Sequence, residues 1–253
     1  MNAWTLFAPL LAAALALPSF AMPPAAPVPR SPGTPLAPVI LDPGHGGDDL
    51  GATVRGVKEK DLALVFAKKL KARLARNAGL PVVLTRDTDR YVTLDGRLVD
   101  SVDMSGSIFV SLHLNQARGK KTAGAIVYSY GPERKTKTRR KRRFPSVPPM
   151  PAPSRGQASD SARLARTFSR ALRADGFKAE ASKAAYYVLK NPSAPSVLIE
   201  LGFLNNPGEA AKLRDGAYQD RMVNSLAKAI EEYAVLRNLH QDIDPVASAL
   251  TKR

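Results

Sequence analysis

The segment Val39-Ile40-Leu41-Asp42-Pro43-Gly44-His45-Gly46-Gly47 is an apolar run that stops at a glycine-rich turn carrying a histidine. A second run, Phe109-Val110-Ser111-Leu112-His113-Leu114-Asn115, also places a histidine where the apolar residues stop. Short apolar runs are typical of strands buried in a parallel sheet. Open α/β sheets bind their ligands just beyond the carboxyl ends of the strands. The sequence therefore predicts that His45 and His113 lie at one edge of an α/β sheet.

Strand-like and helix-like patterns alternate over residues 38–238. We expect strands over residues 38–41, 81–85, 107–112, 124–130, 186–189 and 196–201. We expect helices over residues 59–77, 93–103, 157–174 and 218–237, because apolar residues recur there at helical spacing. This alternation is typical of a largely parallel sheet flanked by helices. We therefore expect one α/β domain over residues 38–238, followed by a C-terminal tail over residues 239–253.

The N-terminus has the pattern of a secretory signal peptide over residues 1–21. Its apolar core spans residues 4–17, and Ser19-Phe20-Ala21 places small residues at the two positions that a signal peptidase reads. A membrane anchor is the alternative, but the run is short and contains Pro9. Residues 22–37 are rich in proline and predict a flexible lead-in. We expect an exported protein, periplasmic or associated with the cell wall, which has no cysteine and depends on its core for stability.

The charge is strongly basic, with 38 Lys and Arg against 22 Asp and Glu and a net charge of +16. Eight of the cations fall within residues 134–143. This run opens a segment, residues 131–156, whose second half is rich in proline and serine, and we expect a disordered loop there. The run has two interpretations, a solvated loop or a tether to anionic wall polymers or lipid head groups. The export signal argues against nucleic acid as a partner.

The two histidines and Glu59 suggest a metal site. Glu59 follows His45 by 14 residues, at the start of the expected helix, and the glycine-rich turn between them allows the chain to fold back. A carboxylate in a first helical turn also interacts favourably with the helix dipole, which is the alternative explanation. Two histidines and one carboxylate leave one coordination position open, as in catalytic rather than structural zinc sites.

Glu200 adds a second carboxylate at the end of the apolar run Ser196-Val197-Leu198-Ile199-Glu200. A charge at the end of a buried strand is unfavourable unless it is paired or used. A glutamate close to a zinc-activated water, but not bound to the metal, is what a general base requires. For His240, close to the C-terminus, we expect an ordinary hydrogen-bonded side chain.

Four motifs occur in one order along the chain. They are residues 40–47 continued by Gly51-Ala52 and Glu59-Lys60-Asp61; residues 84–89 followed by Leu94 and Arg97; residues 111–115; and residues 195–206. With these motifs the chain resembles the zinc-dependent N-acetylmuramoyl-L-alanine amidases of the type-3 amidase family, which cut bacterial peptidoglycan.

The resemblance implies a six-stranded mixed sheet flanked by helices. It also implies that His45, Glu59 and His113 hold one Zn²⁺ ion and that Glu200 is the catalytic carboxylate. The substrate bond that it implies joins the lactyl group of N-acetylmuramic acid to L-alanine of the stem peptide.

One departure from the family concerns activation. Some relatives carry an inserted helix that covers the zinc until a partner protein removes it. The corresponding stretch here, residues 131–156, has no helical apolar periodicity, so we expect activity without an activator. Three alternatives to an amidase are a zinc peptidase acting on the stem peptide, a wall-binding protein without activity, and a polyanion-binding protein.

Two arginines of the second motif, Arg86 and Arg97, also have two interpretations. Either pairs with a neighbouring carboxylate, Asp87, Asp89 or Asp95, or binds a carboxylate of the stem peptide through its guanidinium fork. The structural interpretation is the one that we favour, because such pairs within a protein are common.

Overall fold

The structure, a computed structural model, describes residues 38–132 and 151–250 except for Gly79, Ser105, Arg118 and Lys120. The expected signal peptide, the proline-rich lead-in and residues 133–150 of the expected basic loop lie outside the described residues. Gly156, the last residue of that expected loop, instead belongs to a helix.

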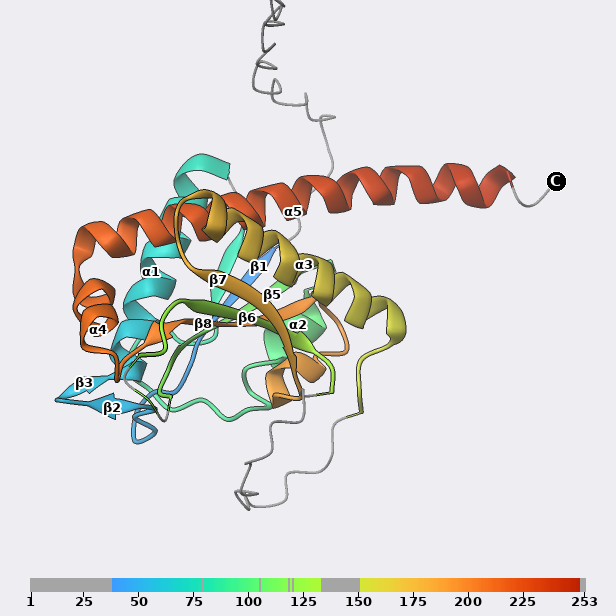
Figure 1. The fold of residues 1–253 in the computed structure, drawn as a ribbon. Helices are drawn as coiled ribbons and strands as arrows, with labels where there is room; N and C mark the ends of the chain where they lie inside the picture. Colours follow the sequence, from blue (N-terminus) through green and yellow to red (C-terminus); the bar gives the residue numbers. More distant parts are fainter. Residues whose placement is uncertain are drawn as a thin grey trace, which may run out of the picture. The chain divides into compact units, whose positions relative to one another are not determined.

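A six-stranded mixed sheet forms the centre of the fold (Figure 1), as the sequence predicted. The strands lie in the order β4 (Val82–Leu84), β1 (Val39–Pro43), β5 (Ile108–Asn115), β8 (Ser196–Phe203), β6 (Ala125–Tyr130) and β7 (Ala179–Ala184). Every neighbouring pair is parallel except β8 and β6, which are antiparallel. β8, the last strand in the described chain, therefore lies between β5 and β6.

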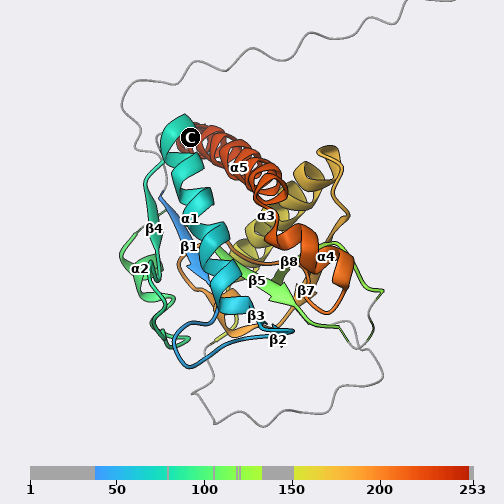
Figure 2. The same ribbon diagram turned by 90° about the vertical axis from the view of Figure 1, so that its left-hand side faces the viewer.

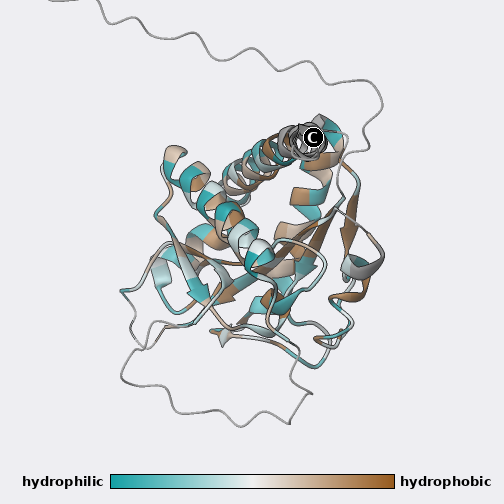
Figure 3. Ribbon diagram, turned by 90° about the vertical axis from the view of Figure 1, so that its right-hand side faces the viewer, coloured by the Kyte–Doolittle hydropathy of each residue, from teal (hydrophilic) through white to brown (hydrophobic). Residues whose placement is uncertain are grey.

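Three long helices cover one face of the sheet: α1 (Glu59–Ala78), α3 (Arg155–Ala174) and α5 (Gly216–Leu250). α5 packs against both α1 and α3, which lie on either side of it (Figure 2). In Figure 3, α3 alternates polar and apolar residues along its length. Among the described helices, none has both the length and the apolar composition needed to cross a bilayer.

Alternation along the strands decides which side chains face these helices. Every second residue of β5 and β8 packs into the core under the long helices. These residues are Ile108, Val110, Leu112, Leu114, Val197, Ile199 and Leu201. Because successive side chains of a strand point to opposite faces, His113 and Glu200 lie on the other face of the sheet. A smaller apolar cluster covers part of that face, near α2 (Val99–Asp103) and the 3₁₀ helix η1 (Tyr187–Lys190).

The sequence misplaced one strand. Residues 186–189, expected as a strand, fall largely in η1, and the sixth strand is β7. A four-residue apolar run does not distinguish a strand from a short helix, because it is too short to show a period. The sequence did not predict β7, because it is an edge strand with a single buried residue and no apolar run.

Smaller differences concern short elements and helix ends. The hairpin of β2 (Thr53–Val54) and β3 (Val57–Lys58) and helix α4 (Pro207–Arg214) were not expected. The helix expected over residues 93–103 is limited to α2. α3 begins two residues early because Ser154 and Gln157 form a capping box. α5 continues to Leu250, across residues 239–250 of the expected tail.

Candidate metal centre

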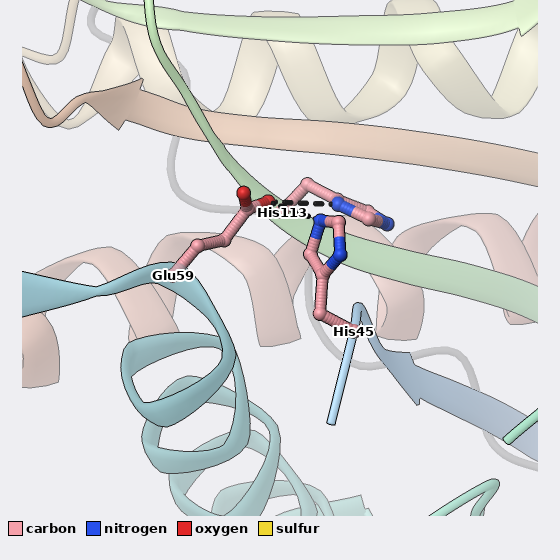
Figure 4. A group of neighbouring side chains, drawn as sticks. All are labelled: His45, Glu59 and His113. Carbon is pink, nitrogen blue, oxygen red and sulfur yellow. Dashed lines mark hydrogen bonds and ion pairs between the residues drawn. The ribbon is translucent and has the colours of Figure 1, made fainter. Parts of the chain in front are cut away.

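Three side chains from distant parts of the chain converge at one end of the sheet (Figure 4). His45 comes from the turn after β1, Glu59 is the first residue of α1, and His113 lies in β5. Their potential ligand atoms all lie within 4.8 Å of one another. Glu59 Oε1 is 3.2 Å from His45 Nε2 and 2.8 Å from His113 Nδ1. The three residues that the sequence proposed as a group are therefore neighbours in space.

Glu59 is held in place by the main chain. The backbone N–H of Ala52 donates to Oε2 at 2.7 Å, and that of Leu114 donates to Oε1 at 3.0 Å. Burial alone would raise the pKa of the Glu59 carboxyl, but hydrogen bonds from His113 and His45 hold that pKa well below its usual range. The result is an ionised carboxylate facing two imidazole rings.

Two glycines give the three side chains room to meet. A Cβ atom on Gly44 would lie only 2.3 Å from Cε1 of His113. A Cβ atom on Gly51 would lie 2.6 Å from both Glu59 Oε2 and His45 Cδ2, and the backbone of Gly51 has a φ of +65°. Only glycine allows so close an approach of backbone and side chains at these positions.

Two buried arginines hold the turn that carries His45. The backbone of His45 has a φ of 59°, a left-handed conformation that is uncommon outside glycine. Arg86 donates through Nε to the carbonyl of Pro43 at 2.9 Å and through Nη2 to that of Gly44 at 2.8 Å. Arg97 donates through Nη1 to the carbonyl of Pro43 and through Nη2 to that of His45, both at 2.9 Å. Three consecutive carbonyls of the turn are thus bound by guanidinium groups.

The ion-pair partner of Arg97 is Asp42. Its Oδ1 lies 2.7 Å from Nη1 of Arg97, and the hydroxyls of Thr85 and Ser111 donate to the same carboxylate at 2.6 and 2.7 Å. The prediction that Arg97 pairs with Asp87, Asp89 or Asp95 was wrong, because pairing follows the fold and not the closeness of residues in the sequence.

Arg86 also departs from the prediction. No carboxylate of the described residues lies within ion-pair distance of it, and it binds carbonyl groups instead. Arg86 and Arg97 are 0% and 4% exposed. Both therefore bind groups of the protein itself, as we favoured, although not the predicted carboxylates. Neither presents its guanidinium fork at the surface. Asp89 pairs with Lys60 at 2.6 Å and accepts from the N–H of Gly47 at 2.8 Å, which ties the same turn to α1.

Glu200 lies beside His113. The two residues are directly paired in the parallel register of β5 and β8 and therefore point to the same face of the sheet. Neither is at the end of its strand, since β5 continues to Asn115 and β8 to Phe203. Within the part of the chain that the structure describes, Oε2 of Glu200 is buried and has no hydrogen-bond partner. Burial raises the pKa of Glu200 to about 7.

Sequence reasoning missed Asp49. Its carboxylate lies 2.8 Å from Nδ1 of His45, and its backbone forms an isolated bridge with Gly46. Its spacing of four residues from a proposed ligand is the only signal in the sequence, and exposed aspartates in turns are common. His240, for which we expected an ordinary role, lies in α5.

A family model described as N-acetylmuramoyl-L-alanine amidase matches residues 39–232, which include His45, Glu59, His113 and Glu200. The chain belongs to this family.

Two relatives are similar to the chain over most of its length. It is 33% identical over 200 residues to the endolysin of Bacillus phage SPP1, in an alignment that covers 79% of this chain and 66% of the endolysin. It is 29% identical over 197 residues to the N-acetylmuramoyl-L-alanine amidase LytC of Bacillus subtilis (strain 168), covering 77% of this chain but 35% of LytC. The matched region thus spans between a third and two thirds of these relatives.

A solved structure shows the same fold. The N-acetylmuramoyl-L-alanine amidase AmiC2 of Nostoc punctiforme superimposes with a TM-score of 0.64 and 30% sequence identity, over 79% of this chain and 98% of that chain. Because the match takes in nearly all of that chain, the described domain corresponds to a complete amidase fold.

Proposed function

We propose that this chain hydrolyses the amide bond between N-acetylmuramic acid and L-alanine in bacterial peptidoglycan. One observation carries the proposal: His45, Glu59 and His113 converge, and a buried carboxylate without a partner, Glu200, lies on the next strand. Membership in the amidase family supports this activity over that of other zinc hydrolases.

The residues fit one zinc ion. Two imidazole nitrogens and a carboxylate oxygen form the N/O ligand set of a catalytic zinc site. The space that Gly44 and Gly51 leave between the three side chains supports the same assignment. Mn²⁺ or Co²⁺ could occupy a similar ligand set, and metal analysis distinguishes them. A zinc ion held by these residues would lower the pKa of a bound water towards neutrality and would polarise the substrate carbonyl.

Glu200 acts as the general base. Its carboxylate takes a proton from the attacking water and later gives that proton to the departing amine of L-alanine. Burial raises the pKa of Glu200 in the metal-free protein, so the carboxyl can hold a proton more readily than an exposed glutamate does. The main-chain hydrogen bonds to Glu59 fix that carboxylate in the position of the proposed metal ligand. Glu200 is therefore the carboxylate that remains available to accept a proton.

The first test is digestion of purified peptidoglycan by the full chain with and without a chelator. We expect free lactyl groups and intact stem peptides that begin with L-alanine, identified by mass spectrometry, and no digestion with the chelator until zinc is restored. Cleavage within the stem peptide would show a peptidase instead. Binding without cleavage would show a wall-binding protein.

Two variants separate the proposed roles. Glu200→Gln should keep its zinc and lose about 10²–10⁴-fold in kcat, because the general base is removed. His113→Ala should lose zinc and activity together, measured by metal analysis and by peptidoglycan digestion. A Glu200→Gln protein with normal turnover would refute the assignment of the base.

The cellular setting is also part of the proposal. We infer export to the periplasm or cell wall, where peptidoglycan lies, and activity of the purified enzyme without an activator. Residues 134–143 would tether the enzyme to anionic wall polymers or lipid head groups, and this binding should weaken as salt rises. Sedimentation with purified wall at low and high salt tests the tether, and the digestion assay without added protein tests the activator.

A further inference from the structure

Asp49 contacts the metal-site histidine from the side opposite Glu59. Its Oδ2 lies 2.8 Å from His45 Nδ1, while Nε2 of the same ring faces Glu59 at 3.2 Å. The two nitrogens of the His45 ring therefore face two different carboxylates.

The position of Asp49 is itself fixed. Its N–H donates to the carbonyl of Gly46 at 3.2 Å, and its carbonyl accepts from the N–H of Gly46 at 2.9 Å. Its second carboxylate oxygen, Oδ1, accepts from the N–H of Gly51 at 3.2 Å. These contacts close the turn into a small loop that holds the carboxylate against the ring.

Both ring nitrogens of His45 face a carboxylate, and a carboxylate accepts a hydrogen bond from whichever nitrogen carries a proton. A metal ion held by Nε2, the nitrogen that faces Glu59, would need the lone pair of that nitrogen. Nδ1 would then carry the proton and donate it to Asp49. For His113, Glu59 is the only carboxylate within ion-pair distance among the described residues.

We propose that Asp49 is a positioning residue for the metal ligand His45, which it holds in the Nδ1–H tautomer with its ring aimed at the metal. The inference rests on the proposed zinc site. Partners of this kind, which hydrogen-bond to a metal-binding histidine, commonly change metal affinity by 10–100-fold when removed. Asp49 touches neither the reacting atoms nor the metal in this assignment.

The test compares Asp49→Ala, Asp49→Asn and Asp48→Asn in the full chain. Asp48 is a matched control because it is the adjacent exposed aspartate and makes no hydrogen bond or ion pair with the described residues. Zinc affinity is measured by competition with a chelator. We expect a 10–100-fold loss for Asp49→Ala, a smaller loss for Asp49→Asn, whose amide oxygen still accepts a hydrogen bond, and no change for Asp48→Asn.

A second readout reports the ring directly. The chain has only three histidines, so long-range ¹H–¹⁵N spectra of the ¹⁵N-histidine-labelled, zinc-loaded protein assign the tautomer of each. We expect His45 to carry its proton on Nδ1 in the wild type, held by Asp49, and we expect this proton to exchange much faster with water in Asp49→Ala. Thermal unfolding of the zinc-free variants, which we expect to match the wild type, shows that the fold is retained.

The outcomes separate this inference from the proposed function. A wild type that binds zinc and cleaves peptidoglycan, with zinc affinity and Nδ1 proton exchange unchanged in Asp49→Ala, would overturn the role of Asp49 alone. A wild type that binds no zinc would overturn both.

Discussion

The two sides of the candidate metal centre are built in different ways. On one side, His113 and Glu200 lie on neighbouring parallel strands, where the main-chain ladder of β5 and β8 sets their positions. On the other side, His45 lies on a turn outside the sheet ladder, with positive φ angles at His45, Gly46 and Gly47. Side chains from later in the chain, above all Arg86 and Arg97, hold that turn.

The difference shows which interactions fix the orientation of the side chains on each side. In the strands, the alternation that buries Leu112 and Ile199 also places His113 and Glu200 on the opposite face, so orientation follows from packing. In the turn, no apolar side chain sets the orientation. A few hydrogen bonds from charged side chains set the orientation of the turn. A single substitution of one of these side chains should therefore have a more local and more severe effect than a substitution in the strands.

The largest expected effect is on the turn. Arg97→Ala leaves Asp42 as a fully buried carboxylate without its cation, which should destabilise the protein by about 3–5 kcal/mol. It also removes a donor from the carbonyl of His45, so zinc affinity should fall. Urea unfolding of the zinc-free protein measures the first effect, and chelator competition measures the second.

The double variant Arg97→Ala with Asp42→Asn is the control. It removes the unpaired charge, so it should recover part of the stability that Arg97→Ala loses, but it should not recover zinc affinity. A loss below about 1 kcal/mol for Arg97→Ala would mean that the turn does not depend on this ion pair, because exposed ion pairs contribute about that much.

The next effect concerns the strand side and depends on pH. Glu200 has a folded-state pKa of about 7, above its ordinary value of 4.5, so the folded protein binds more protons than the unfolded chain in that interval. Stability of the zinc-free wild type should therefore fall as pH rises through this range. Glu200→Gln cannot ionise and should be more stable than the wild type by up to about 3 kcal/mol at pH 8, with little difference near pH 4.

Unfolding free energies of the zinc-free proteins at the two pH values provide the measurement. Glu180→Gln in β7 is the matched control, because Glu180 is exposed and its substitution should give the same difference at both pH values. If Glu200→Gln gave an equal difference at both pH values, burial would not be controlling this carboxyl.

The smallest effect is expected where the two sides meet. Gly44→Ala brings a methyl group against the ring of His113 and should cost about 1–3 kcal/mol, as overpacking usually does. Because the displaced ring belongs to a proposed ligand, zinc affinity should fall as well. Gly216→Ala, whose Cβ meets no atom within 4 Å, is the control: it should leave zinc affinity unchanged and should not lower the stability. Retained zinc affinity in Gly44→Ala would show that His113 can shift without loss.

The strand side was the more predictable from the sequence. Apolar runs marked β1, β5, β6 and β8, and the residues that follow or interrupt them drew attention to His113 and Glu200. The sequence did not show that β5 and β8 are neighbours, because 80 or more residues separate them and strand order depends on the whole chain. That adjacency is what places Glu200 beside His113.

On the turn side, the sequence predicted the proposed ligand His45 and its neighbour Glu59, but it did not predict the side chains that hold the turn in place. The glycines around His45 and the position of Glu59 at a helix start were visible in the motif. The roles of Asp42, Arg86 and Arg97 depend on contacts across 42–69 residues of sequence, and local charge patterns suggested the wrong partners. The orientation of Asp49 depends on a turn whose backbone conformation no periodicity encodes.

The place of β8 in the sheet has a consequence for how the protein is assembled. Until residues 196–203 insert, the strands on either side of them have no common neighbour, and β5 and β6 each expose an unpaired edge. Contacts between segments so far apart in sequence form slowly during folding. A chain shortened before Ser196 would lack Glu200 and leave these edges unpaired, so it should be prone to aggregate, and the proposed site would be complete only after β8 has inserted.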